Sequence, residues 1–292
     1  MDGSVLAQFL ITGLSVGSVY ALIAVGLVTV YNITGVINFA HGEFVMIGAL
    51  TCVSLHEMGL GLLPAALLAI VITGLIGGIV ERTAIYPARN ASFVVLLIIT
   101  IGVSILFRAF GQLIWGTNPK PLPPFSNNTP IEIFGAVLVP QSIWIFAVLV
   151  FLLVLLYVFF EKTVMGSAVK ACVINPKAAR LMGINISNMS AYSFMVSAAL
   201  GAVAGIVMTP VTSASYDMGL FLGLKGFVAM VFGGMNNISG AIAGGLMLGV
   251  IEAMAGGYIS TAYSDAIIFG ILLIALFLFP NGLLGKALGK RV

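Results

Sequence analysis

Charged residues are scarce in this chain. Of its 292 residues only 7% are charged, whereas 61% are hydrophobic. Soluble globular domains carry about 25% charged residues, so water cannot be the medium around most of this protein. The composition predicts an all-α polytopic membrane protein. The length fits one membrane domain over residues 1–292, without a large soluble domain.

Cysteine frameworks, metal-ligand spacings and nucleotide-binding motifs are also missing. Cys52 and Cys172 are the only cysteines, so no disulfide framework is indicated. His41 and His56 fall on different segments, without the spacing of metal ligands. The chain has no Gly-x-x-x-x-Gly-Lys-[Ser/Thr] sequence, whose backbone amides would hold phosphates. We therefore expect no catalytic residue, metal site, cofactor or nucleic-acid partner for this chain, and energy supplied from outside it.

Long apolar runs are what the chain has instead. Most of them reach the roughly 20 residues that a membrane-spanning helix needs, so we expect about eight or nine transmembrane segments. Two of these runs, 218–234 and 238–257, are short and glycine-rich, and only a Met-Asn-Asn turn separates them. We interpret 218–257 as two tilted spans or two re-entrant half-helices. The apolar runs are 5–31, 35–55, 61–80, 92–115, 139–160, 188–211, 218–234, 238–257 and 263–280.

The basic residues predict how the chain is oriented in the membrane. If the spans alternate, Lys120 is the one basic residue in the loops on the opposite side from most of the others. Because Lys and Arg accumulate in cytoplasmic loops, we expect the N-terminus outside and the C-terminus in the cytoplasm. The basic residues on the expected cytoplasmic side are Arg82, Arg89, Lys162, Lys170, Lys177, Arg180, Lys286, Lys290 and Arg291.

Polar residues interrupt the second apolar run. Gly35 and the preceding Asn-Ile-Thr weaken the helix, so we expect a short or broken helix within 32–50, which is tolerated only where protein or a water-filled cavity covers it. Asn38 and His41, three residues apart, share a face if the helix is regular. Glu43 then points roughly 200° away from His41. All three are candidates for the translocation path: Asn38 and His41 beside it, and Glu43 against a neighbouring helix or an internal cation. The alternative is that all three are structural.

Three further charged residues fall inside apolar runs. Lys225, Glu252 and Arg108 are interpreted as structural anchors rather than parts of a substrate site. Lys225 can be neutralised by an acid on another helix, and Glu252 and Asp217 are the candidates, because an unpaired charge inside a membrane is costly.

A long polar loop, 162–187, separates two of the apolar runs. Ser167 is a candidate N-cap for a short helix over about 168–174. Asn175 followed by Pro176 predicts the start of a second helix, which Gly183 can end in the left-handed conformation. Two interpretations remain open: an amphipathic helix that rests on anionic lipid, or a projection that docks in the groove of a partner protein.

Three stretches of this sequence resemble one family of transporters. The chain is similar, over essentially its whole length, to permease subunits of branched-chain amino acid ABC importers, the H-type permease of the Liv system. The stretches are GSVYALIAVGLVTVYNITGVINFAHGEFVMIGAL (17–50), GSAVKACVINPKAARLMGIN (166–185) and GLKGFVAMVFGGMNNISGAIAGGLMLGVIE (223–252).

The resemblance implies a function for the 162–187 loop and a set of partners. The loop is expected to be the coupling helix region that contacts an ATPase. The expected partners are a second homologous permease in a heterodimer, two ABC ATPase subunits that carry ATP and Mg²⁺, a periplasmic substrate-binding protein and membrane lipid. The coupling residues we expect are Gly166, Ala171, Asn175, Pro176, Ala179, Arg180 and Gly183.

The expected function is therefore ATP-driven import of branched-chain or related amino acids across a bacterial inner membrane, from periplasm to cytoplasm. Two alternatives remain. The same machine can carry urea, amides or another small polar solute. The chain can also be a secondary transporter or channel driven by an ion gradient, which would equally lack a nucleotide-binding motif.

Overall fold

The computed structural model describes residues 3–127, 129–133, 135–278 and 282–284. Lys286, Lys290 and Arg291, which contributed to the predicted orientation, lie outside the described residues. Helices dominate, and one short antiparallel hairpin separates the fourth from the fifth helix. The elements are α1 (Gly3–Thr34), α2 (His41–Glu57), α3 (Leu62–Val80), η1 (Glu81–Ile85), α4 (Phe93–Trp115), β1 (Ile131–Ile133), β2 (Ala136–Leu138), α5 (Pro140–Lys162), α6 (Val164–Ile174), α7 (Pro176–Leu181), α8 (Ile186–Thr212), α9 (Met218–Gly233), α10 (Ile238–Tyr258), η2 (Thr261–Tyr263) and α11 (Ser264–Leu278).

Six helices of the described chain are long and apolar enough to cross a membrane. They are α1, α3 with its η1 extension, α4, α5, α8 and α10. The other three apolar runs form the shorter helices α2, α9 and α11, of 17, 16 and 15 residues. At about 1.5 Å per residue, these three are shorter than the roughly 30 Å of a bilayer's hydrocarbon core. The protein is thus a helical, multi-pass membrane protein.

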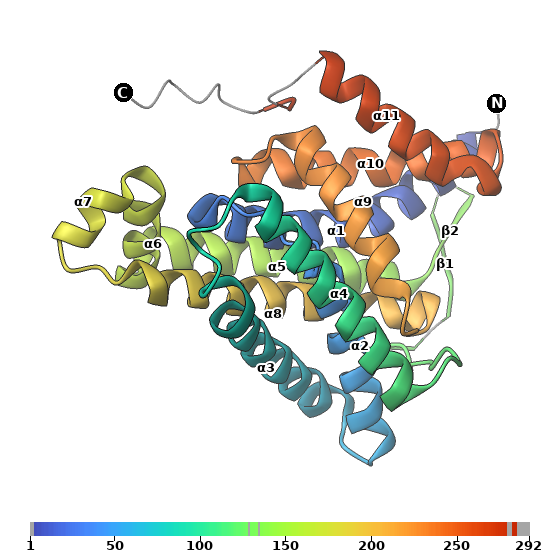
Figure 1. The fold of residues 1–292 in the computed structure, drawn as a ribbon. Helices are drawn as coiled ribbons and strands as arrows, with labels where there is room; N and C mark the ends of the chain where they lie inside the picture. Colours follow the sequence, from blue (N-terminus) through green and yellow to red (C-terminus); the bar gives the residue numbers. More distant parts are fainter. Residues whose placement is uncertain (1–2, 128, 134, 279–281, 285–292) are drawn as a thin grey trace.

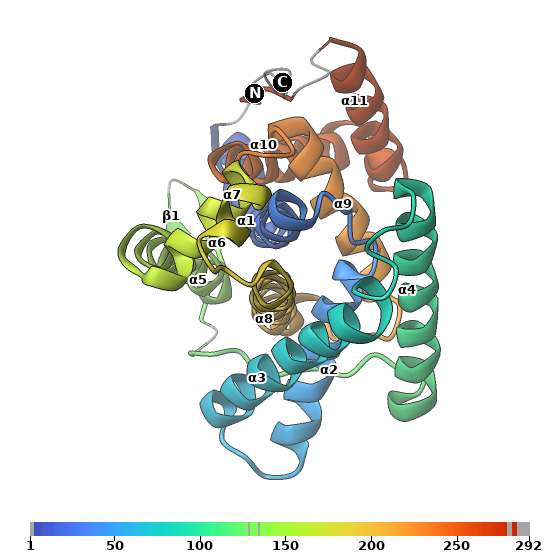
Figure 2. The same cartoon turned by 60° about the vertical axis from the view of Figure 1, so that its left-hand side comes forward.

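Helix α1 forms the centre of the molecule. It is the most buried of the six long helices, and α5, α8, α9 and α10 surround it (Figure 2). Small residues allow the closest approach, between α1 and α10. A Cβ added at Gly17 would lie 2.8 Å from the carbonyl oxygen of Gly245 and 2.9 Å from the Cα of Leu246. Glycine at such positions lets helix backbones touch in membranes.

Different elements lie at the two ends of the molecule. The helices α6 and α7 project from one end, and the β1–β2 hairpin lies at the other (Figure 1). In that hairpin, Ile131 of β1 lies opposite Leu138 of β2. Lys120 forms an ion pair with Glu57, with 3.0 Å between Nζ and Oε2, beyond α2 and α4 and away from α6 and α7.

The predicted break in the 32–50 stretch is present. Helix α1 ends at Thr34, Gly35 has φ of +68°, and α2 begins at His41. The connection is held by its own side chains, because Asn38 Oδ1 accepts a hydrogen bond from the Ala40 N–H at 3.1 Å. Asn38 therefore precedes the helix, so the regular helix on which Asn38 and His41 would share a face is not present.

The 218–257 region consists of two helices joined by a turn. Helix α9 ends at Gly233, and Gly234 adopts φ of +119°. Helix α10 then starts with a capped N-terminus, since Asn237 Oδ1 accepts a hydrogen bond from the Ser239 N–H at 3.0 Å. Of the pair, only α10 is among the helices long enough to span a bilayer.

Candidate translocation site

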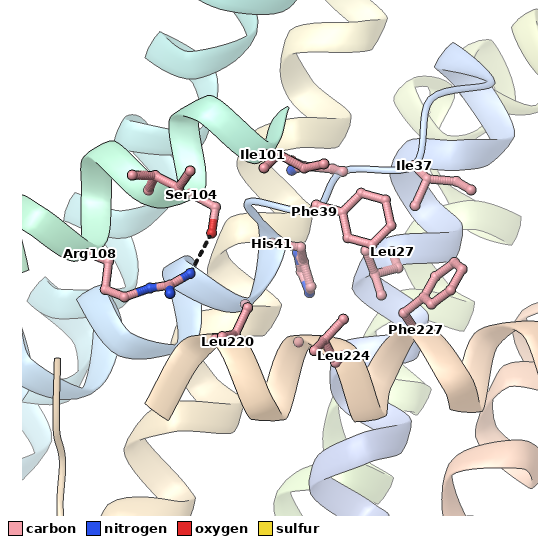
Figure 3. A pocket seen from close by; sticks show the side chains of 14 residues that line it. Leu27, Ile37, Phe39, His41, Ile101, Ser104, Arg108, Leu220, Leu224 and Phe227 are labelled. Atoms are coloured by element: carbon pink, nitrogen blue, oxygen red, sulfur yellow. Dashed lines mark hydrogen bonds between the residues drawn. The ribbon is translucent and has the colours of Figure 1, made fainter. Parts of the chain in front are cut away.

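A small cavity lies where the α1–α2 connection meets α4 and α9. Its volume is about 90 Å³, room for roughly three waters at about 30 Å³ each. Figure 3 shows side chains from several elements around it: Leu27 of α1, Phe39 and His41, Ser104 and Arg108 of α4, and Leu224 of α9. The full lining is Leu27, Ile37, Asn38, Phe39, His41, Gly42, Ile101, Ser104, Ile105, Arg108, Leu220, Gly223, Leu224 and Phe227.

Asn38 and His41 are both on this lining, brought there by the end of the connection and the first residue of α2. Each is 1% exposed. Asn38 Nδ2 and His41 Nε2 have no hydrogen-bond partner among the described residues. Both polar side chains therefore belong to the wall of this cavity.

The imidazole of His41 is fixed from two sides. Its Nδ1 lies 3.0 Å from Ser197 Oγ on α8. Gly26 of α1 makes room for the ring, because a Cβ at Gly26 would lie 2.5 Å from His41 Cε1 and 2.7 Å from Nε2. The sequence did not reveal either neighbour, since both depend on how α1 and α8 pack.

Glu43 faces α4 rather than the cavity. Its Oε1 accepts hydrogen bonds from Ser104 Oγ at 2.8 Å and from Arg108 Nη2 at 3.3 Å. The carboxylate is 1% exposed, whereas the Arg108 side chain is 27% exposed. Glu43 thus lies against the neighbouring helix α4 and the cation of Arg108. Ser104 and Arg108 are the cavity residues that it positions.

Lys225 belongs to a second, partly buried network, away from the cavity. Its Nζ lies 2.6 Å from Glu252 Oε1 and 2.8 Å from Asp265 Oδ1. Tyr20 donates to Glu252 Oε2 at 2.6 Å. The pairing with Glu252 agrees with the expectation, while Asp265 on α11, not Asp217, supplies the second carboxylate. The network joins α1, α9, α10 and α11.

The 162–187 loop folds into α6 and α7. The N-cap of α6 is Thr163, whose Oγ1 accepts a hydrogen bond from the Gly166 N–H at 2.9 Å. The expectation of Ser167 at this position is wrong, because the helix begins at Val164 and Ser167 lies inside it. Gly166 is where α6 turns back on α5: a Cβ there would lie 2.6 Å from Phe160 Cα.

The expected boundaries of α7 agree with the structure. Asn175 Oδ1 accepts a hydrogen bond from the Ala178 N–H at 3.0 Å, Pro176 is the first helical residue, and Gly183 has φ of +82°. Ala171 is partly buried and Ala179 is only 3% exposed. Ala179 packs with Cys172 in a small core beneath the helix pair.

The outer face of the helix pair is apolar and open. Ile174 is 80% exposed, Leu181 88% and Met182 82%. Arg180, from the same turn as Leu181, is also exposed. A partner that docks here would therefore contact Ile174, Leu181 and Met182, not the buried Ala179.

No cluster of three or more His, Cys, Asp or Glu side chains suited to a metal occurs within the described ranges. Arg108 instead pairs with Glu43 beside the cavity, and Lys225 pairs with Glu252 and Asp265.

Comparisons with known proteins agree with this architecture. A family model described as the permease component of branched-chain amino acid transport systems matches residues 9–276. The high-affinity branched-chain amino acid transport system permease protein LivH of Salmonella typhimurium is 38% identical, over 98% of this chain and 97% of that protein. The corresponding protein BraD of Pseudomonas aeruginosa is 36% identical, with the same coverage. A probable LivH of Methanocaldococcus jannaschii is 28% identical over 90% of this chain and 88% of that protein. The chain belongs to the family of permease components of branched-chain amino acid transport systems.

Proposed function

We propose that this chain is the transmembrane permease subunit of an ATP-driven ABC importer, which moves branched-chain amino acids from the periplasm to the cytoplasm. The observation that carries the proposal is the α6–α7 pair, an apolar projection inserted between the spanning helices α5 and α8. The relatives named above are branched-chain amino acid permease proteins, which supports the choice of solute.

The α6–α7 pair is the proposed contact with an ATPase subunit. Its two helices are capped at each break and share a small core with Met189 of α8, which links the pair to the spanning helices. Ile174, Leu181 and Met182 form the docking face. Gly166, Asn175, Pro176 and Gly183 set the shape of the pair, and Ala171 and Ala179 fill the contact between its helices.

The translocation path is proposed to run beside Asn38 and His41. A cavity of about 90 Å³ is smaller than ligand pockets, which are usually about 300–1,000 Å³. Passage of an amino acid therefore requires α2, α4 and α9 to separate. Glu43 contributes by holding Arg108 and Ser104 of α4 at the wall of the path.

The proposed assembly contains a second homologous permease, two ATPase subunits that bind ATP and Mg²⁺, and a periplasmic substrate-binding protein, in a bacterial inner membrane. The α6–α7 end is proposed to face the cytoplasm, with the N-terminus outside and the C-terminus inside. Lys170 and Arg180 lie on α6 and α7, Arg82 donates to Ser187 and Asn188 at the start of α8, and Arg89 lines a cavity together with Arg180. Basic residues are expected in such cytoplasmic segments.

Co-purification with the ATPase subunits tests the docking face. Leu181→Asp combined with Met182→Asp is expected to abolish recovery of the ATPase with the permease. Met58→Asp is the matched control, because Met58 is 77% exposed in the turn between α2 and α3, away from α6 and α7. Full recovery of the ATPase with the double variant would remove the basis for the proposal.

Chemical labelling tests the orientation. With Cys52 and Cys172 replaced by Ser, Ala178→Cys provides one exposed thiol on α7. A membrane-impermeant maleimide is expected to label it in inside-out vesicles and not in spheroplasts. Labelling in spheroplasts alone would place α6 and α7 outside the cell and contradict the proposed direction of transport.

A further inference from the structure

A second cavity opens near the α6–α7 end, apart from the one beside His41. Its volume is about 330 Å³, within the usual range of ligand pockets. It is enclosed by the end of α1 and the connection after it, η1 and the turn that follows, the first turns of α4, α7 and the start of α8. Polar side chains supply more than half of the lining: Thr34, Glu81, Tyr86, Arg89, Asn90, Arg180, Ser187 and Ser190, beside Ile33, Val36, Ile85, Leu96 and Ile186.

The carboxylate on this lining is paired within the chain. Glu81 is 2% exposed and accepts a hydrogen bond from Ser190. Its Oε2 lies 3.7 Å from Arg82 Nε. The Nη atoms of Arg82 donate to Ser187 and Asn188 at 2.6 Å each, which fixes the guanidinium beside the carboxylate. Glu81 and Arg82 thus neutralise each other without a ligand.

Two further guanidinium groups line the cavity, and both are exposed. Arg89 lies over the ring of Tyr86, with 4.3 Å between Cζ and the ring centroid. It is close enough to attract Glu81. Within the described ranges, however, neither Arg89 nor Arg180 forms an ion pair with an acidic side chain at 4.0 Å or less. Since Arg82 already balances Glu81, these two arginines leave an excess of positive charge around the cavity.

The cavity lies where two spanning helices reach the membrane surface. The span formed by α3 and η1 ends at Ile85, and the span α4 starts at Phe93. On the first turn of α4, Phe93 is 48% exposed and Val94 60%. Exposed apolar side chains of a spanning helix face lipid tails, and lipid headgroups lie just beyond the ends of such spans. The two free arginines are therefore within reach of the headgroup layer.

We propose that this cavity binds the phosphate group of an anionic phospholipid. Arg89 and Arg180 donate to the phosphate oxygens, for which the planar guanidinium is well shaped. Asn90 supplies a neutral donor at the rim, and the acyl chains leave the cavity along Phe93 and Val94. Basic pockets between spanning helices are a known means of recognising lipid headgroups.

The lipid site goes beyond the proposed function and does not depend on it. Arg180 belongs to α7, whereas Arg89 belongs to the turn after η1. A phosphate group held by both arginines therefore ties the projecting helix pair to the spanning helices. An anionic lipid is expected to hold α7 in place whether or not an ATPase is bound.

Native mass spectrometry of the full-length chain tests the site. The chain is released from nanodiscs with equal amounts of dioleoylphosphatidylglycerol and dioleoylphosphatidylcholine, which share their acyl chains and phosphate but differ in net charge. We expect the native chain to retain phosphatidylglycerol preferentially. Arg89→Gln combined with Arg180→Gln should reduce that preference about tenfold or more, since a hydrogen bond to a charged group contributes about that factor. No preference in the native chain would overturn the site.

Lys162→Gln combined with Lys177→Gln is the matched control. This variant removes the same amount of positive charge from exposed positions on α5 and α7, off the cavity lining. It should retain phosphatidylglycerol as the native chain does. Equal losses in the two double variants would indicate a general attraction to the basic end of the molecule and would overturn the site.

A competition on the native chain keeps the test decisive if the arginine variant does not fold. In phosphatidylcholine nanodiscs, spin-labelled phosphatidylglycerol is expected to show a motionally restricted component that unlabelled phosphatidylglycerol displaces. Glycerophosphoglycerol, the same headgroup without acyl chains, should displace it at least about tenfold less well, because it buries no acyl chain. Absence of the restricted component would overturn the proposal. Equal displacement by glycerophosphoglycerol would also overturn it and assign the cavity to a soluble phosphate ester.

Discussion

Arg108 Nη2 lies 3.3 Å from Glu43 Oε1 and ties α4 to α2 across the wall of the central cavity. Ser104 supports the contact, since it donates to the same carboxylate oxygen at 2.8 Å. Helix α4 is the least buried of the six long helices, so few other contacts hold it against the body of the protein. The pair therefore fixes the distance between α2 and α4.

Replacing Glu43 by Gln is expected to destabilise the protein by about 1–3 kcal/mol, because Arg108 and Ser104 lose a charged acceptor. Thermal unfolding in detergent and leucine uptake should both report the loss. The double variant Glu43→Gln, Arg108→Gln should lose less stability than the sum of the losses of the two single variants, as for any coupled pair. Strict additivity would mean that the contact contributes nothing.

A second expectation concerns the close approach of Gly26 to His41. Gly26→Ala should displace the imidazole and weaken its contact with Ser197, costing about 1–3 kcal/mol as overpacking usually does. His41→Ala made in the same chain should relieve the clash, so that Gly26→Ala then has little effect. The unfolding temperatures of the native protein, the two single variants and the double variant measure this coupling. If Gly26→Ala destabilises the protein equally in the His41→Ala background, the added methyl group does not contact the imidazole ring.

Two glycines on different helices provide a matched comparison. At Gly17 an added Cβ would meet the backbone of α10 at 2.8 Å, whereas at Gly102 of α4 nothing lies within 4 Å. Gly17→Ala is expected to destabilise the folded protein by about 1–3 kcal/mol. Gly102→Ala should be neutral or stabilising by up to about 1 kcal/mol through helix propensity. Similar unfolding temperatures for the two variants would contradict the close packing of α1 on α10.

Cys172 reports on the packing of α6 and α7 without any substitution. It is 1% exposed, and burial raises the pKa of its thiol. Since the thiolate is the reactive form, Cys172 should react with maleimide more slowly than an exposed thiol at pH 7, and a higher pH than usual should be needed for fast reaction. Ala178→Cys in the Cys172→Ser chain provides the exposed comparison. Equal rates at pH 7 would show that the helix pair is open.

Features set by local chemistry could be predicted from the sequence. The break before α2 follows from Gly35 and its polar neighbours, and the boundaries of α7 follow from Asn175, Pro176 and Gly183. These residues act on their own backbone, so their effect does not depend on distant parts of the chain. The apolar runs likewise became helices, although α2 and α9 are shorter than their runs.

Features set by packing could not be predicted. Whether Glu43 faces Arg108 depends on the relative rotation of α2 and α4. The second carboxylate on Lys225 comes from Asp265, 40 positions further along the chain (265 minus 225), and spacing gives no sign of it. Ala179 is buried because α7 folds back on α6, which the sequence of a six-residue helix does not show.

Uptake by a reconstituted importer tests the central claim most directly. The chain, its partner permease, the ATPase subunits and the substrate-binding protein would be assembled in proteoliposomes, and accumulation of tritiated L-leucine measured. The account predicts uptake that requires ATP, is lost when this chain is omitted, and is lost with Leu181→Asp, Met182→Asp but not with Met58→Asp. Leucine uptake by this chain without the ATPase subunits, driven by an ion gradient, would contradict it.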